Sequence, residues 1–238
     1  MGKYVYRNKG SKDNIIISIA GVHGVGKTTV FNLFKKDNKV KDNKKFKFFP
    51  ERYVKNPPFP FGSSNKQIGF RSELHFLQQL IRRNQNIVNF DNNYNGRIII
   101  LDRSPLCVLV YSKSLNLKEK DYKLIFDTYK SIEWKEDYIF YLSAEPNTIM
   151  KRIIQRGSLE KIRSEWNEDD KDYLLKIISY YKQFLANHKK VFTINTEDLT
   201  PEEVIVEMKA LITQLSGYSF DKFDRTLSTQ MDLLKFLK

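Results

Sequence analysis

The residues with the clearest chemical meaning form the stretch GVHGVGKTT at 21–29, which follows an apolar run and precedes a helical pattern. It matches the pattern G-x-x-x-x-G-K-[ST], in which glycines let the backbone N–H groups close round a phosphate at a helix N-terminus. Lys27 can reach the β- and γ-phosphate oxygens, and the Thr28 hydroxyl can bind Mg²⁺. The stretch is therefore predicted to bind a nucleoside triphosphate. Its members are Gly21, Val22, His23, Gly24, Val25, Gly26, Lys27, Thr28 and Thr29.

A second chemical feature, Asp102 followed by Arg103, stands where the apolar run RIIILD ends. The carboxyl end of a parallel strand beside the phosphate-binding loop opens onto the ligand crevice of such sheets. Asp102 could bind Mg²⁺ there, directly or through water, and Arg103 could hold a phosphate with paired hydrogen bonds. An exposed ion pair at a strand end is the alternative. The sequence contains no N-K-x-D motif for guanine, which argues against a signalling GTPase.

The elements that must position these residues follow from the hydrophobic pattern. Short β-branched runs bounded by turn signals predict strands at 14–21, 45–51, 97–102, 137–143 and 190–195. Helical patterns occupy 27–36, 67–88, 119–134, 146–156, 169–187 and 201–214. This alternation predicts an α/β P-loop NTPase fold, with a parallel five-stranded sheet and helices on both faces. Polar or proline-rich stretches at 35–45, 56–65 and 89–96 are expected to be loops.

Length and composition limit the class of protein. The 238 residues suffice for one α/β domain with a sizeable core. Lys and Arg exceed Asp and Glu by 41 to 28, and the net charge of +13 suits polyanionic partners such as nucleotides, or else a solvated basic surface. The single cysteine, Cys107, excludes an intrachain disulfide and suits a reducing compartment. No signal-like start and no membrane-length apolar run occur, so the chain is expected to be soluble, cytoplasmic and free of the membrane.

Three segments, GVHGVGKTT, LDRSPLCVLVY and RIIQRG in this order, make the sequence resemble the thymidylate kinase and deoxynucleoside kinase group of P-loop kinases. The resemblance covers about residues 14–214. Asp102-Arg103 with Tyr111 is similar to the D-R-…-Y of thymidylate kinases. Arg103-Ser104 is similar to the E-R-S of deoxynucleoside kinases, with Asp in place of Glu. The resemblance implies ATP as the phosphoryl donor and Mg²⁺ as the cofactor.

His23 departs from the thymidylate kinase pattern. Those enzymes commonly carry an acidic residue at this position, near the substrate sugar. P-loop relatives that resemble nicotinamide riboside kinases carry histidine there. The alternative is that His23 simply faces solvent.

Arginines in the segment near 151–166 are predicted to form a lid. Arg152 and Arg156 are four residues apart, hence on one helical face, and Arg163 follows. Like charges placed in this way repel, so an anionic partner would explain them, and phosphoryl transfer needs such a partner. The resemblance implies that they close over ATP and clamp the transferring phosphoryl group. A basic solvent-exposed face is the alternative.

The acceptor side starts from Glu51, which ends the strand predicted at 45–51. In deoxynucleoside kinases a glutamate after this strand resembles a general base for the 5′-hydroxyl. If the acceptor is a monophosphate, Arg52 or Arg71 could bind its phosphate, with Arg103 alongside. On the helix predicted at 67–88, Gln78 is predicted to form hydrogen bonds with the edge of a base.

These residues together predict an ATP- and Mg²⁺-dependent phosphotransferase with a small-molecule nucleoside or nucleotide acceptor. Transfer of the γ-phosphate to a (deoxy)nucleoside monophosphate, as in thymidylate kinase, is the first interpretation. A (deoxy)nucleoside or nicotinamide riboside-type kinase acting on a 5′-hydroxyl is the second. A P-loop ATPase associated with nucleic acid is the alternative from another class, supported by the charge of +13 but by no RNA-binding or helix-turn-helix signature.

The chain is divided into a kinase domain over 1–216 and a C-terminal extension over 217–238. In the extension, large apolar residues recur at three- and four-residue steps, which predicts one amphipathic helix; they are Phe220, Phe223, Leu227, Met231, Leu234 and Leu237. The apolar face is expected to dock on the chain's own body or on a second copy. A homodimer is therefore possible, as in many kinases of the group it resembles.

Overall fold

The computed structural model describes residues 13–51, 63, 65–155, 167–186, 188 and 190–220. Its centre is a five-stranded sheet with the order β2-β3-β1-β4-β5, in which every pair of neighbours is parallel. The strands are β1 (Ile15–Ala20), β2 (Phe46–Phe49), β3 (Ile98–Asp102), β4 (Tyr138–Ser143) and β5 (Val191–Asn195). Each lies within a run predicted to be a strand, so the predicted sheet is confirmed.

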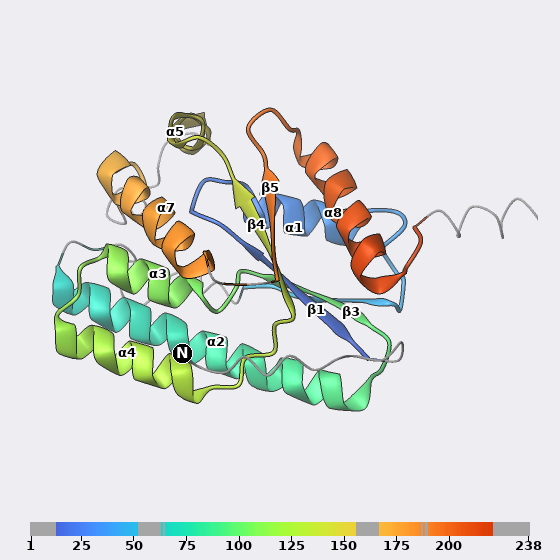
Figure 1. The fold of residues 1–238 in the computed structure, drawn as a ribbon, viewed down its shortest axis with the longest axis horizontal. Coiled ribbons are helices and arrows are strands. Elements are labelled where there is room, and N and C mark those ends of the chain that lie inside the picture. Colours follow the sequence, from blue (N-terminus) through green and yellow to red (C-terminus); the bar gives the residue numbers. More distant parts are fainter. Residues whose placement is uncertain are drawn as a thin grey trace, which may run out of the picture.

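Helices cover both faces of this sheet, as predicted (Figure 1). One face carries α1 (Lys27–Lys36) and α8 (Pro201–Ser216), which pack against each other. The other face carries α2 (Lys66–Asn93), α3 (Cys107–Ser114), α4 (Glu119–Ser131) and α7 (Lys171–Leu185). The remaining labelled helix, α5 (Pro146–Gln155), packs against α7 near the carboxyl ends of the strands.

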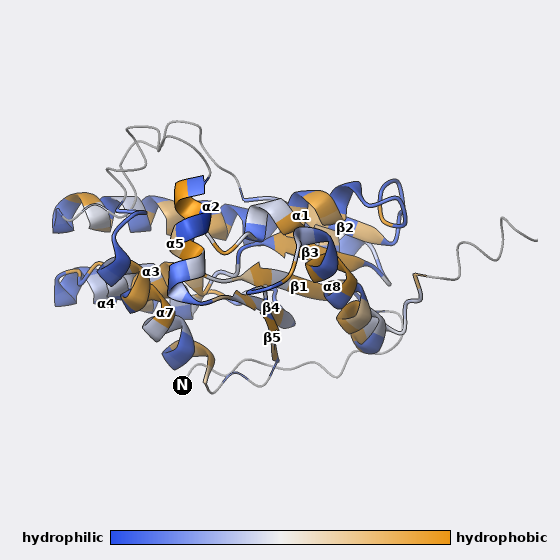
Figure 2. Cartoon of the chain, turned by 90° about the horizontal axis from the view of Figure 1, so that it is seen from above, coloured by the Kyte–Doolittle hydropathy of each residue, from blue (hydrophilic) through white to orange (hydrophobic). Residues whose placement is uncertain are grey.

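The central strands explain why the sheet is buried on both faces. In β1 and β3, Ile17 lies opposite Ile100, and both side chains are fully buried. A strand covered by helices on both faces needs a continuous apolar run rather than an alternating one, and these runs are of that kind. The apolar residues accordingly gather along the strands and the inner helix faces (Figure 2). No helix in the described part of the chain is long and apolar enough to span a membrane.

Two features of the helical layer differ from the sequence prediction. Helix α2 runs to Asn93, into the segment predicted as a loop at 89–96. The Asn14 side chain holds this extra turn by donating to the Asp91 carboxylate at 3.0 Å and to the Tyr94 carbonyl at 2.5 Å. The pattern of small polar residues gave no sign of this tertiary contact.

Helix α3 was not predicted, because its sequence CVLVYSKS has the β-branched residues typical of a strand. The Ser104 hydroxyl accepts a hydrogen bond from the Leu106 N–H at 3.2 Å, just before the helix begins. Val108 and Val110 are both fully buried there. Burial between α2 and α7 therefore outweighs the weak helix propensity of this sequence.

The described chain ends with an aromatic cluster formed by Phe34, Phe46, Tyr218 and Phe220. The Phe220 ring stacks on Phe46 at 5.7 Å and meets Phe34 at 6.4 Å, and only 6% of the residue is exposed. The start of the predicted apolar stripe thus packs on the chain's own body. The rest of the extension, 221–238, lies outside the described residues.

Replacing Phe220 with alanine should lower the free energy of unfolding by about 3 kcal/mol, because a buried aromatic side chain is removed from a packed cluster. Urea denaturation of the full chain measures the change. Val206→Ala is the matched control, since Val206 on α8 is 65% exposed and should change stability by less than about 0.5 kcal/mol. Equal midpoints for Phe220→Ala and the parent chain would contradict this packing.

Candidate active site

The phosphate-binding loop connects β1 to α1 at the carboxyl edge of the sheet. Gly21 and Gly24 have φ angles of +141° and +79°, in the region that side-chain-bearing residues rarely adopt. A Cβ on Gly21 would also lie 2.6 Å from the Leu142 carbonyl oxygen. The glycines are therefore required by the path of the backbone, as expected of a loop that wraps a phosphate.

Lys27, at the start of α1, is buried in this loop. Its Nζ donates to the Val22 carbonyl oxygen at 2.7 Å, and the residue is 5% exposed. Burial, followed by the positive charge of Arg103, lowers the pKa of Lys27 from 10.5 to about 7. An ammonium held in this environment is poorly compensated, so a bound phosphate would supply the charge it lacks.

Thr28 and Asp102, the predicted Mg²⁺ ligands, lie together. The Thr28 hydroxyl is 3.4 Å from Asp102 Oδ2. The other carboxylate oxygen, Oδ1, is buried and makes no hydrogen bond with any described residue. Burial and then the Glu51 carboxylate raise the pKa of Asp102, a cost that a bound cation would offset.

These oxygens fit Mg²⁺, which binds through one or two protein oxygens together with substrate phosphates. Within the described ranges, no group of three or more His, Cys, Asp or Glu residues could hold a metal ion by itself. Thr28 and Asp102 would therefore hold the ion jointly with the donor phosphates. The ion would supply charge neutralisation at the β- and γ-phosphates.

Arg103 lies directly beyond β3 in a strained conformation, with φ at +69°. Its Nε is 2.6 Å from Glu51 Oε2, and its guanidinium lies over the Phe76 ring at 5.6 Å. Burial lowers the pKa of Arg103, but the surrounding acidic groups, Glu51 first among them, outweigh this effect and keep the pKa well above its ordinary value. The predicted acceptor residues Glu51 and Arg103 are thus brought together as a charged pair beside Asp102.

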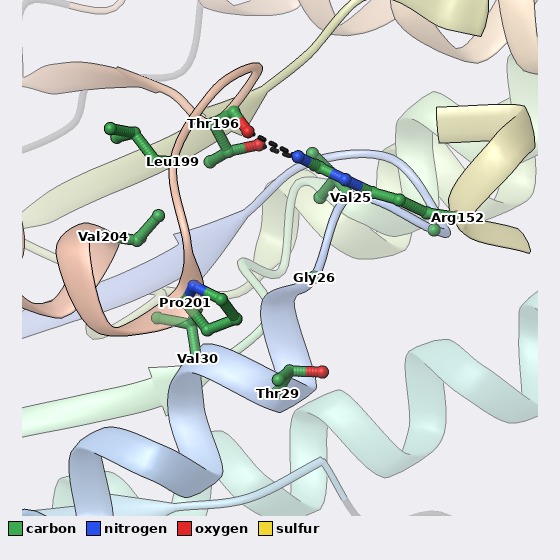
Figure 3. Close-up of a pocket in the computed structure, with 10 residues that line it drawn as sticks. Val25, Gly26, Thr29, Val30, Arg152, Thr196, Leu199, Pro201 and Val204 are labelled. Atoms are coloured by element: carbon green, nitrogen blue, oxygen red, sulfur yellow. Dashed lines mark hydrogen bonds between the residues drawn. The ribbon is translucent and has the colours of Figure 1, made fainter. Parts of the chain in front are cut away.

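A pocket of about 240 Å³ opens on the other side of the loop (Figure 3). Loop and α1 residues face it from one side, and Leu199, Pro201 and Val204 line the opposite wall. Arg152 also lines it, but the guanidinium is engaged by the chain that follows β5. Arg152 Nη1 donates to the Thr196 hydroxyl at 3.0 Å, and Nη2 donates to the Thr196 carbonyl.

The other predicted site residues fall into two groups. Arg71 and Gln78 are seven residues apart on the exposed side of α2. Arg52, Arg156 and Arg163 lie outside the described residues. The same holds for most of the lid predicted at 151–166, of which 156–166 are not described. The structure therefore joins Lys27, Thr28, Asp102, Arg103 and Glu51 in one cluster, and sets Arg152 beside the pocket.

The comparisons with known proteins agree with this geometry. The deoxynucleoside kinase family pattern matches residues 17–215. This chain belongs to the deoxynucleoside kinase family. No curated protein sequence is similar enough to the chain to be counted as a match.

Solved structures show the same fold for this family member. A deoxyadenosine kinase from M. mycoides with dCMP and dCDP bound is 19% identical, with a TM-score of 0.66 over 84% of this chain and 100% of that one. The same enzyme with dATP bound gives 20% identity and a TM-score of 0.63, with the same coverage. The thymidylate kinase of Candida albicans is 16% identical, with a TM-score of 0.65 over 86% of this chain and 93% of that one. The protein is a P-loop nucleoside or nucleotide kinase.

Two buried charged residues of the kinase escaped the sequence analysis. Arg83 on α2 donates to the carbonyl of Asp102 and, at 2.8 Å, to the carbonyl of Arg103. Glu73 on the same helix is only 4% exposed. Both lie on the buried face of α2, with Leu77 and Leu80. A charged residue in register with the apolar face of a helix is the sequence pattern from which they could have been predicted.

Burial raises the pKa of Glu73 to about 8, although the charge of Arg103 opposes the shift. An unfolded glutamate titrates near 4.5, so the folded kinase binds more protons than the unfolded chain between these pH values. Stability from this group is therefore lost as the pH rises through that window.

Between pH 5 and pH 8, the free energy of unfolding of the parent kinase should fall by up to about 3 kcal/mol relative to Glu73→Gln, which cannot ionise. Urea denaturation at each pH measures the difference. Glu133→Gln is the control, because the Glu133 side chain is 79% exposed. A parent chain and Glu73→Gln variant with parallel pH profiles would show that Glu73 titrates normally.

Proposed function

We propose that this kinase transfers the γ-phosphate of ATP to the 5′-hydroxyl of a (deoxy)nucleoside in the presence of Mg²⁺. The observation that carries the proposal is the Glu51 carboxylate at the end of β2, 2.6 Å from Arg103. A 5′-hydroxyl must lose a proton when it attacks phosphorus, and a positioned carboxylate can accept it. Membership of the deoxynucleoside kinase family supports the same acceptor.

The donor side is assigned from the loop and its neighbours. Backbone N–H groups of the loop and Lys27 would hold the β- and γ-phosphates, and Thr28 and Asp102 would hold the metal ion. The pocket between the loop and α8 would receive the nucleoside of the donor, since its apolar wall of Leu199, Pro201 and Val204 suits a flat base.

Arg152 takes a different role in this proposal from the one its spacing suggested. Its guanidinium donates to Thr196, so Arg152 would shape the wall of the donor pocket. Its expected role as a clamp on the transferring phosphoryl group would pass to residues nearer the loop. Arg103, beside both carboxylates, is suited to orient the acceptor and to balance negative charge.

The acceptor is tested by incubating the full chain with ATP, Mg²⁺ and each nucleoside or nucleoside monophosphate, and identifying the products by mass. Conversion of nucleosides to monophosphates is expected. Turnover of monophosphates alone would replace this proposal with a thymidylate kinase-type reaction. ATP hydrolysis stimulated by nucleic acid, with no phosphorylated small molecule, would favour an ATPase.

Glu51→Gln should lower kcat with the best nucleoside by about 10² to 10⁴, because the variant cannot accept the hydroxyl proton. Steady-state kinetics with saturating ATP provide the readout. Glu133→Gln, at an exposed position, is the matched control and should retain parent activity. A Glu51→Gln variant within about tenfold of the parent would rule out base catalysis by Glu51.

Asp102→Asn should raise the Mg²⁺ concentration for half-maximal activity by at least about tenfold and lower kcat, because an amide is a poor ligand for a hard cation. Titration of activity with Mg²⁺ at fixed ATP measures both. An unchanged titration curve with normal kcat would assign Asp102 a structural role only.

A further inference from the structure

His23 is buried inside the site rather than facing solvent, with 8% of the residue exposed. Its backbone N–H donates to the Tyr111 hydroxyl of α3 at 3.1 Å. Its ring lies 6.3 Å from the Tyr111 ring, and stacks on the Tyr173 ring of α7 at 6.0 Å with an interplanar angle of 23°. One residue of the phosphate-binding loop thus contacts α3 and α7, two helices that lie on the same face of the sheet.

Tyr173 is itself held firmly. It stands in the first turn of α7, where the Asp170 carboxylate caps the helix by accepting from the Tyr173 N–H at 3.1 Å. The adjacent Lys171 donates to Asn147 of α5 at 3.1 Å. The residue is 7% exposed, and its buried hydroxyl makes no hydrogen bond within the described ranges. The ring, rather than the hydroxyl, therefore accounts for its contact with His23.

The neighbouring loop residue is fixed in the same way from α5. A Cβ on Gly24 would lie 2.7 Å from a side-chain carbon of Ile153 and 2.9 Å from one of Ile149. Residues 23 and 24 are therefore both placed by helices outside the loop, at the point where the backbone turns through positive φ. In loops of this kind the N–H groups are the phosphate ligands, so any rotation at His23 would redirect them.

We propose that Tyr173 is a positioning residue for the donor phosphates. By stacking on His23 it keeps the N–H groups of the loop in the orientation that a nucleoside triphosphate requires. This role rests on the proposed use of the loop for ATP. It gives α7, a helix with no predicted ligand, an indirect part in donor binding through His23.

Direct binding of ATP to the full chain, measured by titration calorimetry without an acceptor, tests the role. Tyr173→Leu removes the stacked ring and should weaken ATP binding about fivefold, the scale of an aromatic pair. Tyr173→Phe keeps the ring and should restore binding to within about twofold of the parent. Leu175→Ala is the matched control on the same helix, because Leu175 is 41% exposed, and it should bind ATP as the parent does.

A double-variant cycle separates this role from general destabilisation. If Tyr173 acts through His23, Tyr173→Leu should change ATP affinity little further in a His23→Leu background. Independent, additive losses would overturn the proposal, and so would parent-like affinity of Tyr173→Leu. Should Tyr173→Leu fail to fold, His23→Leu removes the other ring and must show the same fivefold loss, or the proposal falls. A parent kinase that does not bind ATP would instead refute the proposed function.

Discussion

The buried guanidinium of Arg83 is the constraint on which the site depends. It donates to the carbonyl oxygens of Asp102 and Arg103, the two residues at which β3 leaves the sheet. Arg103 has φ at +69°, a conformation that costs a residue with a side chain about 1 kcal/mol or more. Such a conformation persists only where several independent contacts hold the backbone in it. Here Arg83 binds the Arg103 carbonyl, and the Ile19 carbonyl accepts from the Arg103 N–H at 3.1 Å.

The strained turn has a consequence for the chemistry. It directs the Arg103 side chain to Glu51, while Asp102 stays beside Thr28. In the proposed reaction, two residues that are adjacent in sequence would thus serve opposite sides, Asp102 with the metal ion and donor and Arg103 with the acceptor. In an extended strand, successive side chains point to opposite faces and would not remain in one crevice. The left-handed residue resolves this conflict, and Arg83 stabilises it.

Charges at the strand ends form a cluster in which Glu51 and Arg103 pair with each other, whereas Lys27 and Asp102 are not fully compensated. The buried Lys27 ammonium donates to the Val22 carbonyl oxygen, and burial lowers the pKa of Lys27 to about 7. Asp102 has the opposite problem, since burial and the neighbouring Glu51 raise its pKa. A triphosphate carrying a divalent cation adds negative charge next to Lys27 and positive charge next to Asp102. Both deficits would be removed together, so the charges of the site match the polarity of such a ligand.

The sequence predicted those features that local pattern controls. All five strands and the start of α1 follow from apolar runs and from the glycines that end β1. The cluster of Lys27, Thr28, Asp102, Arg103 and Glu51 followed because the carboxyl ends of parallel strands share one edge. Helix α3 was missed because burial of Val108 and Val110 overrides their strand propensity. The last turn of α2 was missed because it depends on Asn14, 77 residues from Asp91 in sequence.

Specificity is harder to predict than phosphate chemistry, for a reason visible on α2. Phosphates are bound by backbone N–H groups and by charged side chains at fixed spacing, so a short sequence motif predicts a phosphate site. Acceptor contacts made from a long helix such as α2 depend on which side chains face the sheet, so the helical phase must be known to within one residue. Gln78 was selected for its type, yet it lies on the exposed side, while Glu73 lies in the buried phase. Because the Glu73 carboxyl group is buried, it does not contribute to the charged surface that keeps a protein in solution. Burial raises the pKa of the Glu73 carboxyl group to about 8, and the charge of Arg103 opposes this shift, so Glu73 is a core group that senses the charge of the site.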